Sequence, residues 1–164
     1  MIKKCLKVPG TVAAILMGVV AVYVIYLFAT YHRIADNLPL TVEQPAKKGT
    51  DVDALAIGTE YTALTYNIGF GAYTPDFSFF MDGGESSWAK SKESVLDTVQ
   101  GAGELVVSLR PDFALIEEID LDSTRSYHVD EYALLKECLP EDYTVFAQNY
   151  DSAFLFYPLN QPHG

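Results

Sequence analysis

The chain has 164 residues, enough for one domain with a hydrophobic core and not much more. Its composition is that of a globular protein, with 13% aromatic residues and a net charge of −11. Its two cysteines, Cys5 and Cys138, are too few for a disulfide framework or a metal knuckle, and we expect both to be reduced.

The negative charge is unevenly distributed along the chain. Residues 1–49 contain six Lys and Arg against two Asp and Glu, whereas residues 50–164 contain five against twenty. A domain this acidic is poorly suited to binding a polyanion unaided. The acidic excess suits a domain that recruits divalent cations, or one that simply stays soluble.

An uncharged run extends from Val8 to Tyr31. It is long enough to cross a bilayer core of about 30 Å as a helix. The alternatives are a cleaved signal peptide and a buried core helix. No small-residue cleavage site follows the run and no polar stripe interrupts it, so an uncleaved membrane anchor is favoured over both.

Three lysines precede this run, and they set the predicted topology. By the positive-inside rule, residues 1–7 form a basic cytoplasmic head, and everything after His32 lies outside the cell membrane. Residues 32–59 contain prolines and charges without a strong period, which is typical of a juxtamembrane linker. The remaining domain then comprises residues 60–164.

The domain is expected to begin with a strand over residues 61–70, rich in β-branched and aromatic residues and interrupted near its end by Asn67. A long loop follows, with a cluster of aromatic side chains between residues 70 and 80. Loops of this length are usually functional or disordered, and the aromatic side chains argue against plain disorder. Two readings stay open: a lid over a substrate or membrane, or, slightly favoured, a hydrophobic cover.

The next predicted elements are a helix and a strand. Ser86 or Ser87 is expected to cap a helix that runs to about Leu109, where Pro111 ends it. Apolar residues recur at helical spacing and predict a buried stripe, made of Val95, Val99, Ala102, Val106 and Leu109. Residues 112–119 then read as a strand.

The last part of the chain predicts a second helix and a hairpin. The helix covers residues 120–139, and the hairpin strands cover 143–148 and 153–159. Strand, helix, strand, helix, strand, strand is the order of an α/β domain that closes with a hairpin.

Two oxygen ligands stand at the ends of predicted strands. Asn67 offers a carbonyl oxygen and Glu118 a carboxylate. One or two carboxylates, completed by water and a substrate phosphate, are how Mg²⁺ is usually held in proteins. The alternative is that Glu117 and Glu118 only begin a solvated loop and that Asn67 is a turn residue. Spacing alone favours that alternative.

The stretch LTYNIGFG (residues 64–71), then a helix, then RPDFALIEEIDLDSTRSY (residues 110–127) resembles the first half of the endonuclease/exonuclease/phosphatase superfamily. This superfamily includes DNase I-like nucleases, sphingomyelinases and inositol phosphatases. The resemblance covers about residues 60–160. It implies an α/β fold, the four-layer sandwich of two packed sheets. It matches Asn67 to the asparagine of the first strand and Glu118 to the metal-binding glutamate, with Glu117 at a glutamine position.

The resemblance implies phosphodiester or phosphomonoester hydrolysis that depends on Mg²⁺ or Mn²⁺. Glu118 would hold the metal, and Asn67 would orient metal or phosphate. Arg125 and Tyr127 are weaker candidates for phosphate contact, because Arg125 is as well placed to cap a helix or to pair with Asp122. The substrate stays open among nucleic acid, nucleotide, phospholipid and inositol phosphate.

The sequence departs from the family pattern in its later motifs. Neither His128 nor His163 matches the catalytic histidine, and no Asp-x-Asn pair or Ser-Asp-His motif follows. We therefore expect the N-terminal half of a domain, weakly active or inactive as this chain. The alternative function is a non-catalytic, membrane-tethered binding or structural module outside the cytoplasm.

Overall fold

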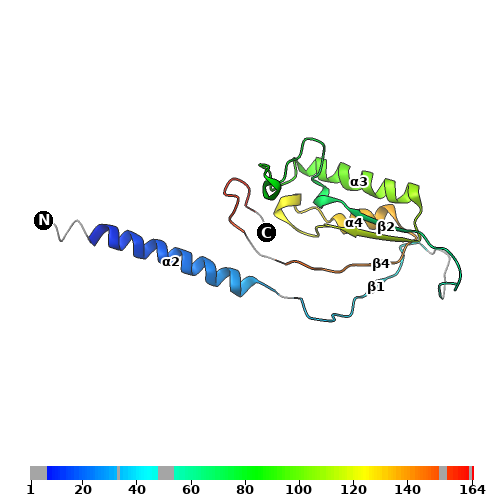
Figure 1. Ribbon diagram of the computed structural model, residues 1–164, viewed down its shortest axis with the longest axis horizontal. Coiled ribbons are helices and arrows are strands. Elements are labelled where there is room, and N and C mark those ends of the chain that lie inside the picture. The colour runs from blue at the N-terminus through cyan, green and yellow to red at the C-terminus, as the bar shows by residue number, and fades with distance from the viewer. Residues whose placement is uncertain (1–6, 33, 48–53, 152–154, 163) are drawn as a thin grey trace. The chain divides into compact units, whose positions relative to one another are not determined.

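The structure is a computed structural model that describes residues 7–32, 34–47, 54–151, 155–162 and 164. The chain divides into two compact units. One comprises Met1–Asp36 with Gln148–Phe154, and the other comprises Asn37–Ala147 with Leu155–Gly164. The described part of the chain is mixed α/β, with three α-helices and two small sheets of two strands each (Figure 1).

The first unit contains α2, a helix over Lys7–Thr30. Its stretch Pro9–Thr30 is long and apolar enough to cross a membrane, and none of it is buried inside the protein. Apolar side chains lie all around this helix instead of along one stripe, as expected of a helix that contacts lipid. The predicted apolar helix is confirmed, while its orientation in a membrane stays a prediction.

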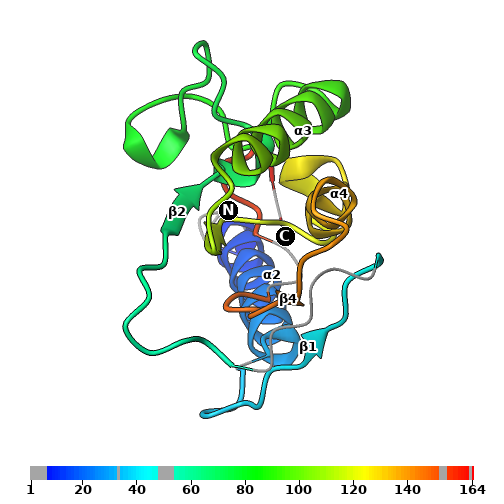
Figure 2. The ribbon, with the colours of Figure 1, turned by 90° about the vertical axis from the view of Figure 1, so that its right-hand side faces the viewer.

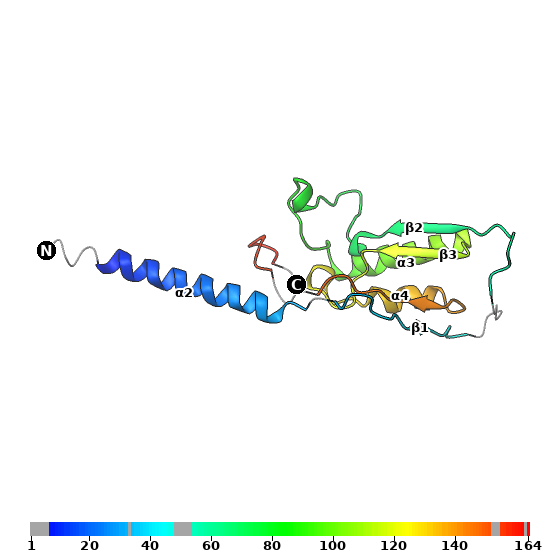
Figure 3. The same cartoon turned by 60° about the horizontal axis from the view of Figure 1, so that its bottom comes forward.

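The second unit is organised around two parallel strands and the helix between them (Figure 3). The strand β2 covers Ala63–Asn67, β3 covers Phe113–Glu117, and the pairing places Asn67 opposite Glu117. Tyr66 and Ile116 pack from these strands against the hydrophobic core. The predicted strands are confirmed but shorter, because the chain turns at Gly69 and at Glu118, both of which have positive φ.

The connecting helix, α3, covers Lys92–Leu109. Its N-cap is Ser91, whose Oγ accepts a hydrogen bond from the Ser94 N–H at 3.1 Å. The prediction of Ser86 or Ser87 as cap is wrong. Ser87 is fully buried, and its Oγ donates instead to the Gln161 carbonyl at 2.5 Å.

The apolar stripe of α3 forms the middle of the core. Most of its predicted members are buried: Val95, Val99, Ala102 and Val106. The predicted fifth member, Leu109, is wrong, because this last residue of the helix is 57% exposed. Three of its members, Val95, Val99 and Ala102, pack into one cluster with residues that include Ile68, Phe70, Val129 and Leu135.

The second domain helix, α4, covers only Glu131–Cys138 and packs beside α3 (Figure 2). Asp130 caps it by accepting from the Ala133 N–H at 2.9 Å. The predicted helix over residues 120–139 is therefore wrong in its first half, which forms a loop with a short 3-10 turn at Thr124–Ser126. Cys138 is a free thiol, and Cys5 lies outside the described residues.

The second small sheet joins the predicted linker to the end of the domain. The strand β1, Val42–Glu43, pairs antiparallel with β4, Thr144–Val145. The Tyr132 hydroxyl is hydrogen-bonded to Glu43 Oε1 at 3.1 Å and to the Thr144 hydroxyl at 2.8 Å, which ties both strands to α4. The predicted closing hairpin is wrong for β4, since its partner is β1. The other predicted hairpin strand covers residues 153–159. Residues 153–154 lie outside the described residues, and residues 156–159 form no strand.

Candidate functional site

The parallel pairing of β2 and β3 brings the two predicted ligands together. Because both strands run the same way, their carboxyl ends lie side by side. The Asn67 amide Nδ2 donates to Glu118 Oε1 at 2.9 Å, and Asn67 Oδ1 accepts from the Gly69 N–H at 2.9 Å. Asn67 therefore holds the Glu118 carboxylate with one end of its amide and the following turn with the other.

Glu118 stands just beyond β3 in a left-handed backbone conformation, with φ of 57°. Its carbonyl oxygen accepts a hydrogen bond from the Phe70 N–H at 2.8 Å. The preceding carbonyl, that of Glu117, accepts a hydrogen bond from the Ile68 N–H at 3.1 Å. A non-glycine residue in this conformation costs on the order of 1–3 kcal/mol and persists only where its surroundings enforce it. The two turns after β2 and β3 thus brace each other.

A shallow pocket of about 300 Å³ opens beside this pair, lined by Asn67, Gly69, Tyr73 and Glu118. Gly69 is required there, because a Cβ on it would lie 2.2 Å from the Tyr73 ring. Burial, followed by the charges of Asp82 and Glu118, raises the pKa of Tyr73 above its ordinary value. The Tyr73 hydroxyl is therefore protonated at neutral pH, and it is hydrogen-bonded to Asp82.

The aromatic loop packs on itself behind the pocket. Phe70 is fully buried, and its ring makes edge contacts with Tyr73, Phe77 and Phe79 at centroid distances of 6.0–6.2 Å. Phe77 and Phe79 are partly buried against the core. These contacts fit a hydrophobic cover better than a lid.

Arg125 lies beneath the Phe70 ring and not in the pocket. Its guanidinium carbon stands 4.0 Å from the ring centroid, and Nε and Nη2 donate to the two Asp120 oxygens at 2.9 and 2.8 Å. Burial lowers the pKa of Arg125, but the hydrogen bonds and charge of Asp120 outweigh it and raise the pKa. Asp122, the partner considered from sequence, is instead 2.5 Å from His128 Nδ1.

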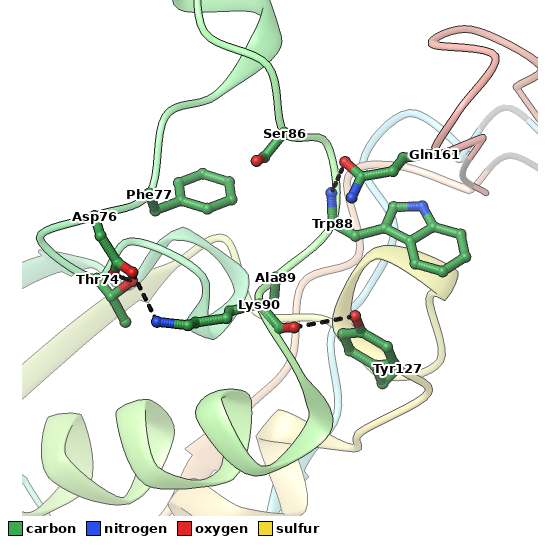
Figure 4. Close-up of a pocket in the computed structure, with 9 residues that line it drawn as sticks. All are labelled: Thr74, Asp76, Phe77, Ser86, Trp88, Ala89, Lys90, Tyr127 and Gln161. Carbon is green, nitrogen blue, oxygen red and sulfur yellow. Dashed lines mark hydrogen bonds and ion pairs between the residues drawn. The ribbon is translucent and has the colours of Figure 1, made fainter.

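Tyr127 lines a different pocket, of about 170 Å³ (Figure 4). Its hydroxyl donates to the Lys90 carbonyl at 3.4 Å, and its ring meets Trp88 edge-on. On the other side of this pocket, Lys90 pairs with Asp76 at 2.7 Å. Hydrogen bonds from Lys90 and Thr74 lower the pKa of Asp76 to about 2. Tyr127 therefore does not join Asn67 and Glu118.

The donor set at the strand ends is small. Among the residues that the structure describes, no group of three or more His, Cys, Asp or Glu side chains could hold a metal ion. Glu117 faces Thr65, which donates to it at 3.3 Å, and Asp120 is paired with Arg125. Glu118 is left as one carboxylate facing a pocket, bonded to the Asn67 amide nitrogen, while the Asn67 Oδ1 is turned to the Gly69 N–H. That fits Mg²⁺, which commonly keeps several waters and binds substrate phosphate.

Sequence reasoning missed Tyr73 and Glu131, which matter here. The sequence marks Tyr73 only as one aromatic residue among several in a long loop. Glu131 is an acid at a helix start, where acids are normally solvated, yet it is fully buried. Comparison of the chain with models of known protein families, with curated proteins and with solved structures finds no match.

Proposed function

We propose that this chain is a membrane-anchored, metal-dependent phosphoesterase of the endonuclease/exonuclease/phosphatase type. The observation that carries the proposal is the 2.9 Å hydrogen bond between Asn67 and Glu118 at the carboxyl ends of two parallel strands. These are the two residues that the sequence resemblance matches to the family asparagine and metal-binding glutamate. The proposal includes the family's four-layer sandwich, of which β2, α3 and β3 would form part.

Glu118 would hold Mg²⁺ or Mn²⁺, and Asn67 would serve as a second ligand if its Oδ1 turned from the Gly69 N–H toward the metal. The metal, when bound, supplies positive charge that stabilises a phosphoryl group. The chain's own contribution is positional. Asn67 fixes one oxygen of Glu118, and the hydrogen bond from Phe70 N–H fixes its backbone. Tyr73 lines the same pocket, and its hydroxyl would donate to a phosphate oxygen in place of its hydrogen bond to Asp82.

The second candidate is a membrane-tethered module without catalysis. One observation favours it: the described residues contain no group of three or more His, Cys, Asp or Glu side chains that could hold a metal ion. In both cases α2 would anchor the chain in the cell membrane with its N-terminus in the cytoplasm. The two candidates differ in whether Mg²⁺ binds at Glu118.

A pair of neighbouring substitutions tests the proposal on the full chain in detergent. Glu118→Gln keeps size and hydrogen bonding but removes the charge. Glu117→Gln is its matched control, since Glu117 faces Thr65. We expect Mg²⁺ to raise the melting temperature of the natural chain and of Glu117→Gln, but not of Glu118→Gln.

The second part of the test measures the rates at which the chain hydrolyses bis(p-nitrophenyl) phosphate and p-nitrophenyl phosphate. Any Mg²⁺-dependent rate should fall by at least about 100-fold in Glu118→Gln and change little in Glu117→Gln. Equal effects of the two substitutions would contradict the proposed role of Glu118. Absence of any Mg²⁺ effect on the natural chain would favour the non-catalytic module.

A further inference from the structure

Glu131 is the one charged side chain that is fully buried in the described part of the chain. It is the first residue of α4. Its Oε2 accepts from the Asp120 N–H at 3.0 Å, and its own N–H donates to the Asp120 carbonyl at 3.0 Å. Its Oε1 is buried and has no hydrogen-bond partner among the described residues. Both Glu131 contacts thus converge on the backbone of a single residue.

Asp120 connects Glu131 to the candidate site. It lies two positions beyond Glu118, and its side chain is only 11% exposed where it binds Arg125. The Arg125 guanidinium in turn lies against the Phe70 ring, and the Phe70 N–H bonds the Glu118 carbonyl. Glu131, Asp120, Arg125 and Phe70 therefore form a continuous support for the Glu118 turn.

The geometry around Glu131 suits an uncharged carboxyl group. An ionised carboxylate here would have one N–H donor and one bare, buried oxygen, which is costly. The positive end of the α4 helix dipole favours the ionised form of Glu131, but burial has the larger effect and favours the uncharged form. Burial and the nearby Asp120 charge raise the pKa of Glu131 to about 8, although the Asp120 N–H and Arg125 oppose the shift. Asp120 and Arg125 are the charged groups acting on it.

We propose that Glu131 is a positioning residue whose uncharged carboxyl group anchors Asp120 and thereby fixes the Glu118 turn, which its ionisation loosens. Neutral Glu131 leaves one carboxylate, Asp120, opposite one cation, Arg125. Ionised Glu131 places a second, buried carboxylate beside the same cation, whose side chain is 24% exposed. The relevance to metal binding rests on the function proposed for Glu118, whereas the coupling of Glu131 to the turn can be measured without it.

The test follows amide hydrogen exchange of Phe70 in the full chain in detergent, between pH 6 and pH 9.5. We expect the protection factor, corrected for intrinsic base-catalysed exchange, to fall once the pH passes about 8. Glu131→Gln, an uncharged mimic, should keep Phe70 protected throughout. Glu137→Gln removes an exposed acid of the same helix and should behave like the natural chain.

The pH dependence of the melting temperature gives a second readout, and the direction of the change can be predicted. In the unfolded chain Glu131 ionises near its ordinary pKa, whereas the folded chain retains the proton up to about pH 8. Folding therefore binds a proton in this window, and the contribution of Glu131 to stability is lost as the pH rises from about 4.5 to about 8. Glu131→Gln should flatten that part of the curve, and Glu137→Gln should not.

The outcomes separate the two proposals. Identical pH profiles of Phe70 protection in the natural chain and Glu131→Gln would overturn the positioning role. If Glu131→Gln does not fold, Asp120→Asn takes its place, because it removes the negative charge beside Glu131. It should lower the pH at which the protection of Phe70 is lost. If that pH does not change, the positioning role of Glu131 is overturned. Where Mg²⁺ binds, its affinity should fall about tenfold between pH 7 and pH 9 in the natural chain only. No Mg²⁺ binding at any pH counts against the proposed function alone.

Discussion

Residues with left-handed backbone conformations gather around the Asn67–Glu118 pair. Gly69, Phe70 and Gly71 follow β2 with φ of 55°, 44° and 64°, and Glu118 follows β3 with φ of 57°. Phe70 and Glu118 carry side chains that disfavour this region by on the order of 1–2 kcal/mol each. Strain of this kind is usually found where a backbone must hold side chains in fixed positions. Here it turns Glu118 out of the strand and toward the pocket.

The substitution Gly69→Ala tests how closely this turn is packed. A Cβ at Gly69 would meet the Tyr73 ring at 2.2 Å, whereas a Cβ at Gly83, also at positive φ, would meet nothing within 4 Å. We expect Gly83→Ala to cost about 1 kcal/mol from backbone strain alone, and Gly69→Ala to cost clearly more. Urea unfolding of the two variants measures the difference. Equal costs would mean that the Tyr73 ring moves away freely.

At the scale of elements, the start of α3 is set by Ser91. Replacing a serine N-cap by alanine typically costs about 1 kcal/mol, so Ser91→Ala should destabilise the domain by that amount. Ser108→Ala is the control, because Ser108 lies exposed near the other end of the helix and bonds only the Leu105 carbonyl. Thermal unfolding of both variants checks the cap. A larger loss in Ser108→Ala would contradict its assignment to Ser91.

The sequence predicts well those features that depend on a local pattern of residues. The stripe of α3 follows from helical spacing, and the meeting of Asn67 with Glu118 follows from two strands joined by one helix. The errors come from specific side-chain contacts that a residue pattern does not reveal. Ser87 does not cap α3, because its hydroxyl is hydrogen-bonded to Gln161, which lies 74 positions away in the sequence. Residues 120–130 are kept from helix formation by the side-chain pair of Asp120 with Arg125 and by the hydrogen bonds that the Asp120 backbone makes with the N–H and the carboxyl group of Glu131.

At the scale of the whole molecule, the first prediction concerns the membrane. The lysines that precede the apolar stretch Pro9–Thr30 predict that the chain after residue 32 lies outside the cytoplasm. Protease added to intact spheroplasts should therefore degrade this part while an N-terminal epitope remains protected. The control is the same digestion after lysis, in which the epitope should also disappear. Protection of the entire chain in spheroplasts would contradict the orientation.

The second molecular prediction concerns the open face of the β2–β3 sheet. Phe113 and Leu115 are 44% and 57% exposed, and no other described strand pairs with either strand. Parallel sheets are normally covered on both faces, so this face favours self-association. Leu115→Lys should reduce self-association of the full chain in detergent, measured by sedimentation. Leu105→Lys, at a 44% exposed position on α3, should not. Equal effects would assign the association elsewhere.

The crossover from β2 through α3 to β3 also has a kinetic consequence. The Asn67–Glu118 bond joins residues that are 51 positions apart, so neither half of the pair exists as a site in a short segment of the chain. The entropy of closing such a loop must be overcome before the parallel strands can pair, which slows folding relative to local contacts. A cation bound at Glu118 would therefore bind only after the crossover has closed. During refolding, the appearance of cation binding would time the completion of the sheet.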